Sequence, residues 1–325
     1  PHTPPPTLRA RNDHATSLSP HTTYIMATTP RSSGASASSI TGQSWEVGSV
    51  TLPRCFGGNG EQVPLRAHIL LGAVPAMACV STALQGGTFA GVFFTFVATG
   101  PLLFGTVLVH EMGHLIQATR RGAHPVEILL WPLGGLAISS NASDDPRDRI
   151  AISASGPATH APMAAFWLLV GSVSISLFFE SLAMYALWLN VSLCAFNLLV
   201  PCFPLDCSQI LVSAMILRGK GARETATIIT AVSVPLVALL ACYGAWTFVT
   251  AGTGVLTVFV ALWLGKQTFD LHSANKEDRL GDHPLFRNPP RRSDDGPTFS
   301  PMNECTCGLG PCVALAVLAA CVPCS

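Results

Sequence analysis

The sequence predicts an all-α membrane protein with about six transmembrane helices and one short membrane-associated β-hairpin. Hydrophobic residues make up 49% of the chain and charged residues only 11%, with a mean hydropathy of +0.44. Ordinary soluble domains carry about 25% charged residues. The apolar residues are also gathered into long segments, and one Pro- and Gly-containing stretch between two of these segments has extended character. These observations favour a chain that crosses a membrane several times.

Six apolar segments follow a polar N-terminal region. They cover roughly residues 67–86, 90–119, 150–178, 182–203, 225–250 and 253–265. A helix rises 1.5 Å per residue, so about 20 residues cross a hydrocarbon core about 30 Å thick. All segments except the last meet this length, and we therefore expect an integral, multi-pass membrane protein.

Basic residues gather at alternate ends of these segments. They are Arg54 and Arg66 before the first segment, Arg120, Arg121, Arg147 and Arg149 after the second, Arg218, Lys220 and Arg223 after the fourth, and Lys266 after the sixth. The opposite loops hold only Glu180. The positive-inside rule then places both termini on the cytosolic or equivalent side. Golgi, endoplasmic reticulum and plastid membranes all fit this pattern.

The two ends of the chain have a different composition from its middle. Residues 1–61 are rich in Pro, Ser, Thr and Gly, and they predict a disordered segment because too few large apolar groups are present to offset the entropy of ordering. Residues 62–268 form the predicted transmembrane domain, and residues 269–325 a disordered tail. The tail ends in five cysteines whose spacing matches no zinc pattern, with a zinc knuckle and an acylation site as the alternatives.

The second apolar segment contains the motif His110-Glu111-Met112-Gly113-His114. Residues four apart lie on one face of a helix, so both imidazoles can bind the same Zn²⁺ while Glu111 lies beside its open position. The motif continues an uncharged run that begins at Phe89. Ionisable residues within a membrane span are costly and are candidates for function. We therefore expect a zinc site with Glu111 as the general base.

A hairpin or re-entrant loop is expected directly after this segment, over Val126–Ile138, where two short extended runs flank Pro132, Gly134 and Gly135. Non-helical backbone at membrane depth is tolerated when it packs on protein or lines a cavity. The hairpin should therefore lie against the helix that carries the motif.

Two histidines leave a catalytic zinc ion one protein ligand short. Asp206 is the best candidate, because Pro201 and Pro204 break the fourth segment just before it and free a turn to face inward. The alternative role for Asp206 is an N-cap of the following helix, over Cys207–Leu217.

With these residues the chain resembles the site-2 protease family of intramembrane zinc metalloproteases, in particular the compact branch with bacterial sporulation and cyanobacterial or plastid members. The resemblance covers about residues 62–218. It rests on Val63–His68, the His110–His114 motif, the Leu133–Gly135 turn, Gly156-Pro157 and Asn197–Asp206. It implies that His110, His114 and Asp206 bind one Zn²⁺ per chain, that Glu111 is the catalytic base and that Asn197 helps to position the substrate.

Two positions depart from the family pattern. Cys207-Ser208 stands where the family usually has Gly-Gly, and a side chain there would be strained if the backbone required a positive φ. His160 stands where the family often has Asn. It either forms hydrogen bonds within the core or approaches the zinc as an extra ligand.

The expected function is that of a zinc metalloendopeptidase, which cleaves membrane proteins in or near their transmembrane segments within the lipid bilayer. The substrate is expected to pair as a strand with the edge near Val126–Ile138. The net charge of zero gives no indication of nucleic-acid binding. The alternatives are a catalytically silent homologue that binds membrane proteins, and an ion or proton transporter that uses the same residues.

Overall fold

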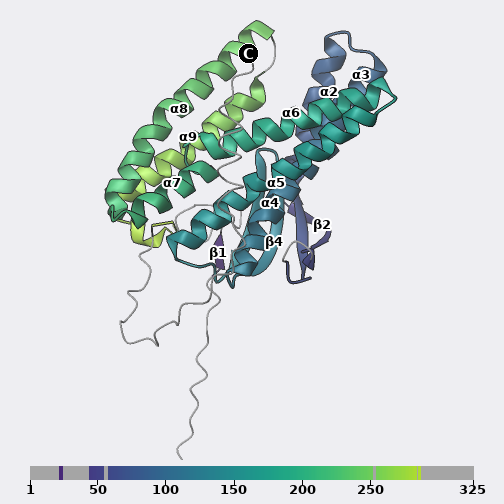
Figure 1. Ribbon diagram of the computed structural model, residues 1–325. Coiled ribbons are helices and arrows are strands. Elements are labelled where there is room, and N and C mark those ends of the chain that lie inside the picture. The colour runs from purple at the N-terminus through teal and green to yellow at the C-terminus, as the bar shows by residue number, and fades with distance from the viewer. Residues whose placement is uncertain (1–21, 25–43, 55–57, 252–253, 284, 287–325) are drawn as a thin grey trace, which may run out of the picture. The chain divides into compact units, whose positions relative to one another are not determined.

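A computed structural model describes residues 22–24, 44–54, 58–251, 254–283 and 285–286, all within one compact unit of residues 1–288. Most of these residues are helical, and a five-stranded sheet lies at one end of the helices (Figure 1). The predicted helical class is therefore confirmed, but the predicted hairpin is part of a larger sheet.

The helices follow the apolar segments closely. They are α2 (Ala73–Leu84), α3 (Phe89–Val97), α4 (Leu103–Arg120), α5 (Pro146–Val173), α6 (Leu177–Leu199), α7 (Asp206–Leu217), α8 (Ala222–Ala251) and α9 (Val255–Lys276). Short 3₁₀ turns cover Ile69–Gly72, before α2, and Leu280–Asp282, after α9. The turns α2–α3 and α5–α6 lie at the end of the helices away from the sheet (Figure 1).

Within the described residues, three continuous helical stretches are long and apolar enough to cross a membrane: Phe89–Arg120, Leu177–Leu199 and Ala222–Thr250. Helix α5 is long but includes buried polar residues such as His160, and α2 has only 12 residues. The number of six transmembrane helices stays a prediction.

Helices α3 and α4 form one stretch despite a proline in its middle. Pro101 lacks the N–H that an α-helix needs, and the chain accommodates it in a π-helical turn over Ala98–Leu102. Such turns are often found at functional sites. The stretch thereby continues into α4, which carries the His110–His114 motif.

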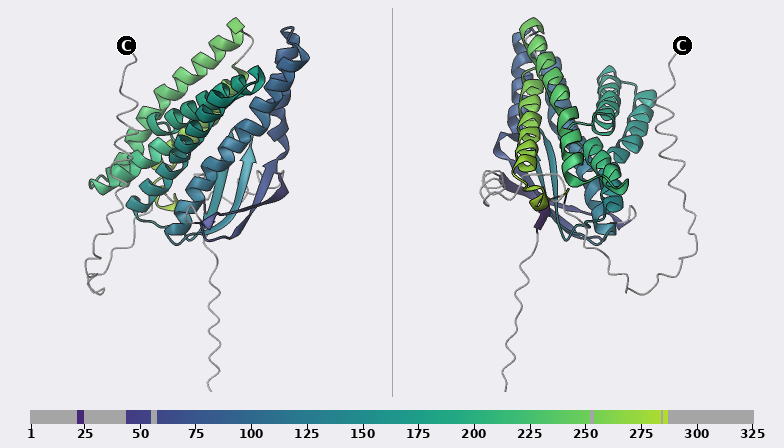
Figure 2. Two further views of the ribbon diagram at one scale, coloured as in Figure 1. Left: turned by 45° about the vertical axis from the view of Figure 1, so that its right-hand side comes forward. Right: turned by 90° about the vertical axis from the view of Figure 1, so that its left-hand side faces the viewer.

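The sheet has the strand order β1-β5-β4-β3-β2. Its strands are β1 (Thr22–Tyr24), β2 (Ser44–Thr51), β3 (Gln62–His68), β4 (His124–Trp131) and β5 (Gly134–Ser140). Strands β4 and β5 form the predicted antiparallel hairpin, with Trp131 opposite Gly134. Strand β3 is parallel to β4, so the chain between them, including α2 to α4, forms the crossover. As predicted for the hairpin, α4 packs against β4 and β5 (Figure 2).

Part of the N-terminal segment expected to be disordered is a strand. Ser44–Thr51 pairs with β3 along its length, with Trp45 opposite Ala67 and Val50 opposite Val63, and Thr22–Tyr24 pairs with β5. The expectation is therefore wrong for these residues. Averaged over 61 residues, the composition hides an eight-residue strand whose pairing partner lies further along the chain.

The expected C-terminal boundary at residue 268 is also wrong. Helix α9 continues to Lys276. Beyond residue 268, Leu271, Leu280, Leu285 and Phe286 are buried in a cluster with Phe203. Lys276, Glu277 and Asp278 of the same segment are exposed, so buried apolar and exposed charged residues alternate there. The Cys-rich end of the tail lies outside the described residues.

The turn between α6 and α7 presents Asp206 to the interior. Helix α6 ends at Leu199, and two prolines follow before α7 begins at Asp206. Phe203 is buried, and its N–H donates to the Ser233 hydroxyl of α8 at 2.9 Å. The turn is thus anchored on α8.

Candidate metal centre

Helix α4 turns one face of the motif toward the interior. His110, Glu111 and His114 are buried, with relative exposures of 6%, 3% and 0%. The same helix approaches α5 closely, since a Cβ on Gly113 would lie 2.7 Å from the Ser155 carbonyl oxygen. This close packing holds both imidazoles between α4 and α5.

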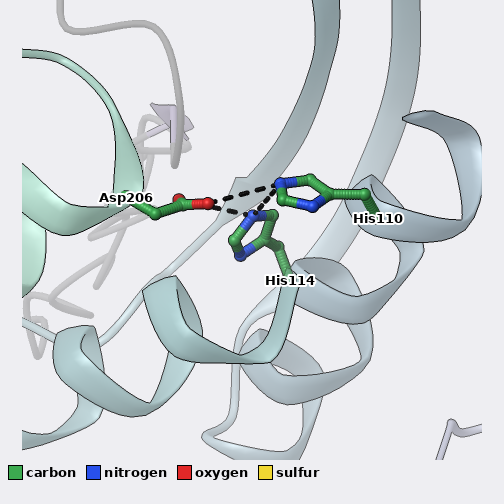
Figure 3. Close-up of side chains that lie close together, drawn as sticks. All are labelled: His110, His114 and Asp206. Carbon is green, nitrogen blue, oxygen red and sulfur yellow. Dashed lines mark hydrogen bonds and ion pairs between the residues drawn. The ribbon is translucent and has the colours of Figure 1, made fainter. Parts of the chain in front are cut away.

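Asp206 joins the two imidazoles from the first turn of α7. Its carboxylate oxygens lie 3.3 Å from His110 Nε2 and 3.5 Å from His114 Nε2, and the two Nε2 atoms are 3.1 Å apart. Figure 3 shows the three side chains pointing toward one another. Leu205, not Asp206, occupies the N-cap position of α7, so the alternative role of Asp206 as an N-cap is wrong.

The donor atoms of this group fit a metal cation. Both carboxylate oxygens of Asp206 are buried without a hydrogen-bond partner. His114 Nδ1 lies 2.7 Å from the Ile152 carbonyl oxygen, which accepts only, so Nδ1 carries a proton. In the neutral ring that a metal ion requires, Nε2 then presents a lone pair. Ligands bound to tetrahedral zinc at 2.0–2.1 Å are about 3.3 Å apart, close to the distances found here. A buried negative charge facing a lone pair at this spacing suits a zinc ion.

Gly156 of α5 forms part of the cradle around these atoms. A Cβ at this position would lie 2.1 Å from His114 Nε2 and 2.8 Å from His110 Nε2. The absence of a side chain therefore lets the α5 backbone pass directly beside the imidazole nitrogens.

Glu111 is held next to the three-residue group by strand β5. Its Oε2 accepts a hydrogen bond from the Ala137 N–H at 3.1 Å. Gly135 lies against its stem, since a Cβ there would be 2.4 Å from Glu111 Cγ. Strand β5 thus fixes the position of the carboxylate.

A cavity of about 300 Å³ opens beside Glu111 and His110. Its walls are mostly apolar and include Trp131 and Trp263, which pack against each other with ring centroids 5.3 Å apart. Asn197 also lines this cavity, and its Nδ2 donates to the Leu193 carbonyl within α6 at 3.1 Å. Asn197 is therefore near the site, and its role stays a prediction.

The replacement of Gly-Gly by Cys207-Ser208 causes no backbone strain. Both residues lie in α7, and the non-glycine residues with positive φ in the described chain are Asn141 and Asp278. The position after Asp206 therefore needs no glycine here.

Two groups near the site were not identified from the sequence. The Ala137 N–H binds Glu111, and the Asn190 side chain binds His160 at 2.9 Å. The signal for Asn190 was its position in the middle of a mostly apolar helix, where a polar residue is a candidate for function. A backbone N–H gives no signal in a sequence.

The site therefore has the features of H-E-x-x-H metalloenzymes, and comparisons with known proteins agree. Residues 99–179 match the model of peptidase family M50. The chain is 31% identical over 213 residues to Rip3 of Mycobacterium tuberculosis, provisionally named a zinc metalloprotease, covering 62% of this chain and 51% of Rip3. It is 29% identical over 155 residues to the zinc metalloprotease MJ0392 of Methanocaldococcus jannaschii, covering 46% of this chain and 42% of MJ0392.

Among solved structures, the site-2 protease from Methanocaldococcus jannaschii aligns with a TM-score of 0.47 and 22% identity, over 68% of this chain and 94% of that one. The resemblance to peptidase family M50, the site-2 proteases, is confirmed by the family and sequence matches. The chain spans about half the length of the curated relatives or less.

Proposed function

We propose that this protein is an intramembrane zinc metalloprotease that hydrolyses peptide bonds in or near the transmembrane segments of other membrane proteins. The observation that carries the proposal is the convergence of His110, His114 and Asp206, from two separate helices, with Glu111 beside them. The three candidate membrane spans support a site within or near a bilayer, since one of them carries the motif.

One Zn²⁺ held by the two imidazoles and Asp206 would supply a Lewis acid and lower the pKa of water at the site. Glu111 accepts a proton from the attacking water and passes it to the leaving amine. The Ala137 N–H keeps the carboxylate in place for both transfers. Asn197 lines the same cavity and is available as a donor to the substrate.

The substrate is proposed to bind as an added strand. The expected edge near Val126–Ile138 must be narrowed, because β4 is paired on both sides, by β3 and β5. Within the described residues, strand β5 pairs with β1 through Ile138–Ser140. Its remaining part, Gly134–Ala137, adjoins Glu111. An extended substrate beside this part would place its backbone next to the general base.

The two alternatives have little support in this site. The departure from the family pattern that would favour a silent homologue is Cys207-Ser208, and both residues lie in an ordinary helix. A transporter that uses the histidines and Asp206 gives no reason for Glu111 to be held by β5. We keep the protease, acting on membrane proteins in a lipid bilayer, as the proposal.

The Glu111→Gln variant tests the proposal. It keeps the shape of the side chain but removes the base, and loss of a general base lowers the rate by about 10²–10⁴-fold. We expect purified Glu111→Gln protein to contain as much zinc as the wild type and to leave a transmembrane reporter uncut. Metal analysis and a cleavage assay in detergent or liposomes measure the two results.

Glu180→Gln is the matched control, because Glu180 lies in the first turn of α6 and does not line the cavity. It should cleave the reporter as the wild type does. Asp206→Ala should lose both zinc and cleavage. Cleavage at the wild-type rate by zinc-loaded Glu111→Gln protein would refute the assignment of the base.

A further inference from the structure

A chain of three buried side chains leads away from the metal-facing imidazole of His110. His110 Nδ1 lies 3.1 Å from His160 Nε2, and His160 Nδ1 lies 2.9 Å from Asn190 Oδ1. The chain runs from α4 through α5 to α6. His160 and Asn190 have relative exposures of 1% and 0%, so both side chains lie in the interior of the protein.

The direction of every hydrogen bond in this chain follows from its far end. The Asn190 Nδ2 donates to the Ala186 carbonyl of its own helix at 2.8 Å. A carbonyl only accepts, so the amide nitrogen must face Ala186 and the amide oxygen must face His160. The Asn190 amide is thereby fixed in one of its two orientations.

The proton positions on both imidazoles follow from this orientation. His160 Nδ1 must carry a proton, because it faces the accepting oxygen of Asn190. In the neutral ring, His160 Nε2 is then an acceptor, and His110 Nδ1 must donate to it. His110 Nε2 is left with its lone pair, directed at the Asp206 carboxylate and His114 Nε2.

The two metal-facing histidines are thus oriented in different ways. His114 donates to a backbone carbonyl, that of Ile152, which no substitution removes. His110 depends on two side chains, each of which can be replaced. A residue that hydrogen-bonds to a metal-bound histidine fixes the tautomer and the ring orientation of that histidine. Loss of such a residue typically weakens metal binding about 10–100-fold.

We propose that His160 and Asn190 form a positioning relay that holds His110 in the tautomer that binds the metal ion. This inference rests on the proposed zinc site but concerns metal affinity, not cleavage. It assigns a role to His160 that differs from an extra zinc ligand. His160 Nε2 is taken up by His110 Nδ1, and His160 is not part of the group formed by His110, His114 and Asp206.

Two substitutions remove the relay at different points. His160→Leu removes the acceptor for His110 Nδ1. Asn190→Leu removes the acceptor for His160 Nδ1. Two hydrogen bonds separate Asn190 from His110, so this second change does not touch a metal-facing residue. His160→Gln is the conservative variant, because its amide oxygen is able to accept from His110 Nδ1. Thr225→Val is the control for a buried polar change, since the Thr225 hydroxyl is fully buried without a hydrogen-bond partner in the described structure.

The measurement is the zinc affinity of the purified full-length protein, determined by competition with a chelator, together with the thermal midpoint of the metal-free protein. We expect His160→Leu and Asn190→Leu each to weaken zinc binding about 10–100-fold. His160→Gln should recover most of the affinity, and Thr225→Val should match the wild type. The double variant His160→Leu/Asn190→Leu should bind zinc no more weakly than His160→Leu alone, because residues acting in one chain are not additive.

Other results would overturn the relay. Wild-type zinc affinity in both leucine variants would do so, as would fully additive effects in the double variant. If His160→Leu fails to fold, Asn190→Leu and His160→Gln still decide the question. A wild-type protein that binds no zinc would instead refute the proposed function, so the two failures are distinguishable.

Discussion

Gly156 is a position at which the metal centre leaves no room for a side chain. The α5 backbone passes beside both Nε2 atoms at this point, and a Cβ would approach His114 Nε2 to 2.1 Å. Such a distance is far inside van der Waals contact, so the imidazoles would have to move away from the position that faces Asp206.

Gly156→Ala is therefore expected to weaken zinc binding by at least about tenfold, the lower limit typical of disturbed outer partners. Alanine favours a helix over glycine by about 1 kcal/mol, so helix propensity cannot cause the loss. The measurement is zinc content after dialysis against a chelator. Gly105→Ala in α4 is the control, because no atom lies within 4 Å of its added Cβ, and equal zinc content in both variants would contradict the cradle.

For single residues, the sequence predicted those site residues that lie close to one another along the chain. His110, Glu111 and His114 were identifiable because their spacing on one helix turn already brings them together. Asp206 required a partner search across about ninety residues, and the two prolines before it supplied the signal. The partners of these residues, Asn190 and the Ala137 N–H, depend on how separate elements pack, which no local pattern encodes.

Among the elements, strand β5 has a role beyond that of a hairpin arm. It binds Glu111 through the Ala137 N–H and packs Gly135 against the Glu111 side chain. Glu111 lies on the same helix as His110 and His114, but its carboxylate is held by a different element, β5. Changes in β5 should therefore affect the base without affecting the metal.

Gly135→Ala tests this separation. The added Cβ would lie 2.4 Å from Glu111 Cγ and should displace the carboxylate, lowering reporter cleavage by about 10²-fold, the lower range for a lost general base. Zinc content should stay at the wild-type level. Gly48→Ala in β2, where no atom lies within 4 Å of the added Cβ, should cleave normally. A parallel loss of zinc in Gly135→Ala would show that β5 positions the metal centre as well.

The helices were easier to predict than the strands. Each apolar segment became a helix, since length and hydropathy are properties of the segment itself. The hairpin β4–β5 was also predictable from a local pattern, because its two strands are neighbours in sequence. Strand β3 lies parallel to β4 across an intervening crossover, and β2 depends on β3, so neither could be placed from local pattern.

For the molecule as a whole, the last helix and the residues after it complete the core around the turn that precedes Asp206. Leu271, Leu280, Leu285 and Phe286 are buried in one cluster with Phe203. Arg149 of α5 adds a bond from its guanidinium to the Leu285 carbonyl at 2.7 Å. The metal centre thus depends on residues more than sixty positions beyond its last candidate ligand.

Two shortened chains test this dependence. A chain that ends at residue 268 lacks all four of these side chains, each of which contributes about 1.5–3 kcal/mol when fully buried. Against a typical total stability of about 5–15 kcal/mol, this loss should lower the thermal midpoint sharply and release Phe203 and the adjoining Asp206 turn. Zinc content should fall with it. A chain that ends at residue 288 keeps the whole cluster and the compact unit, and should match the full chain in midpoint and zinc content. Equal behaviour of the two shortened chains would mean that the cluster does not support the metal centre.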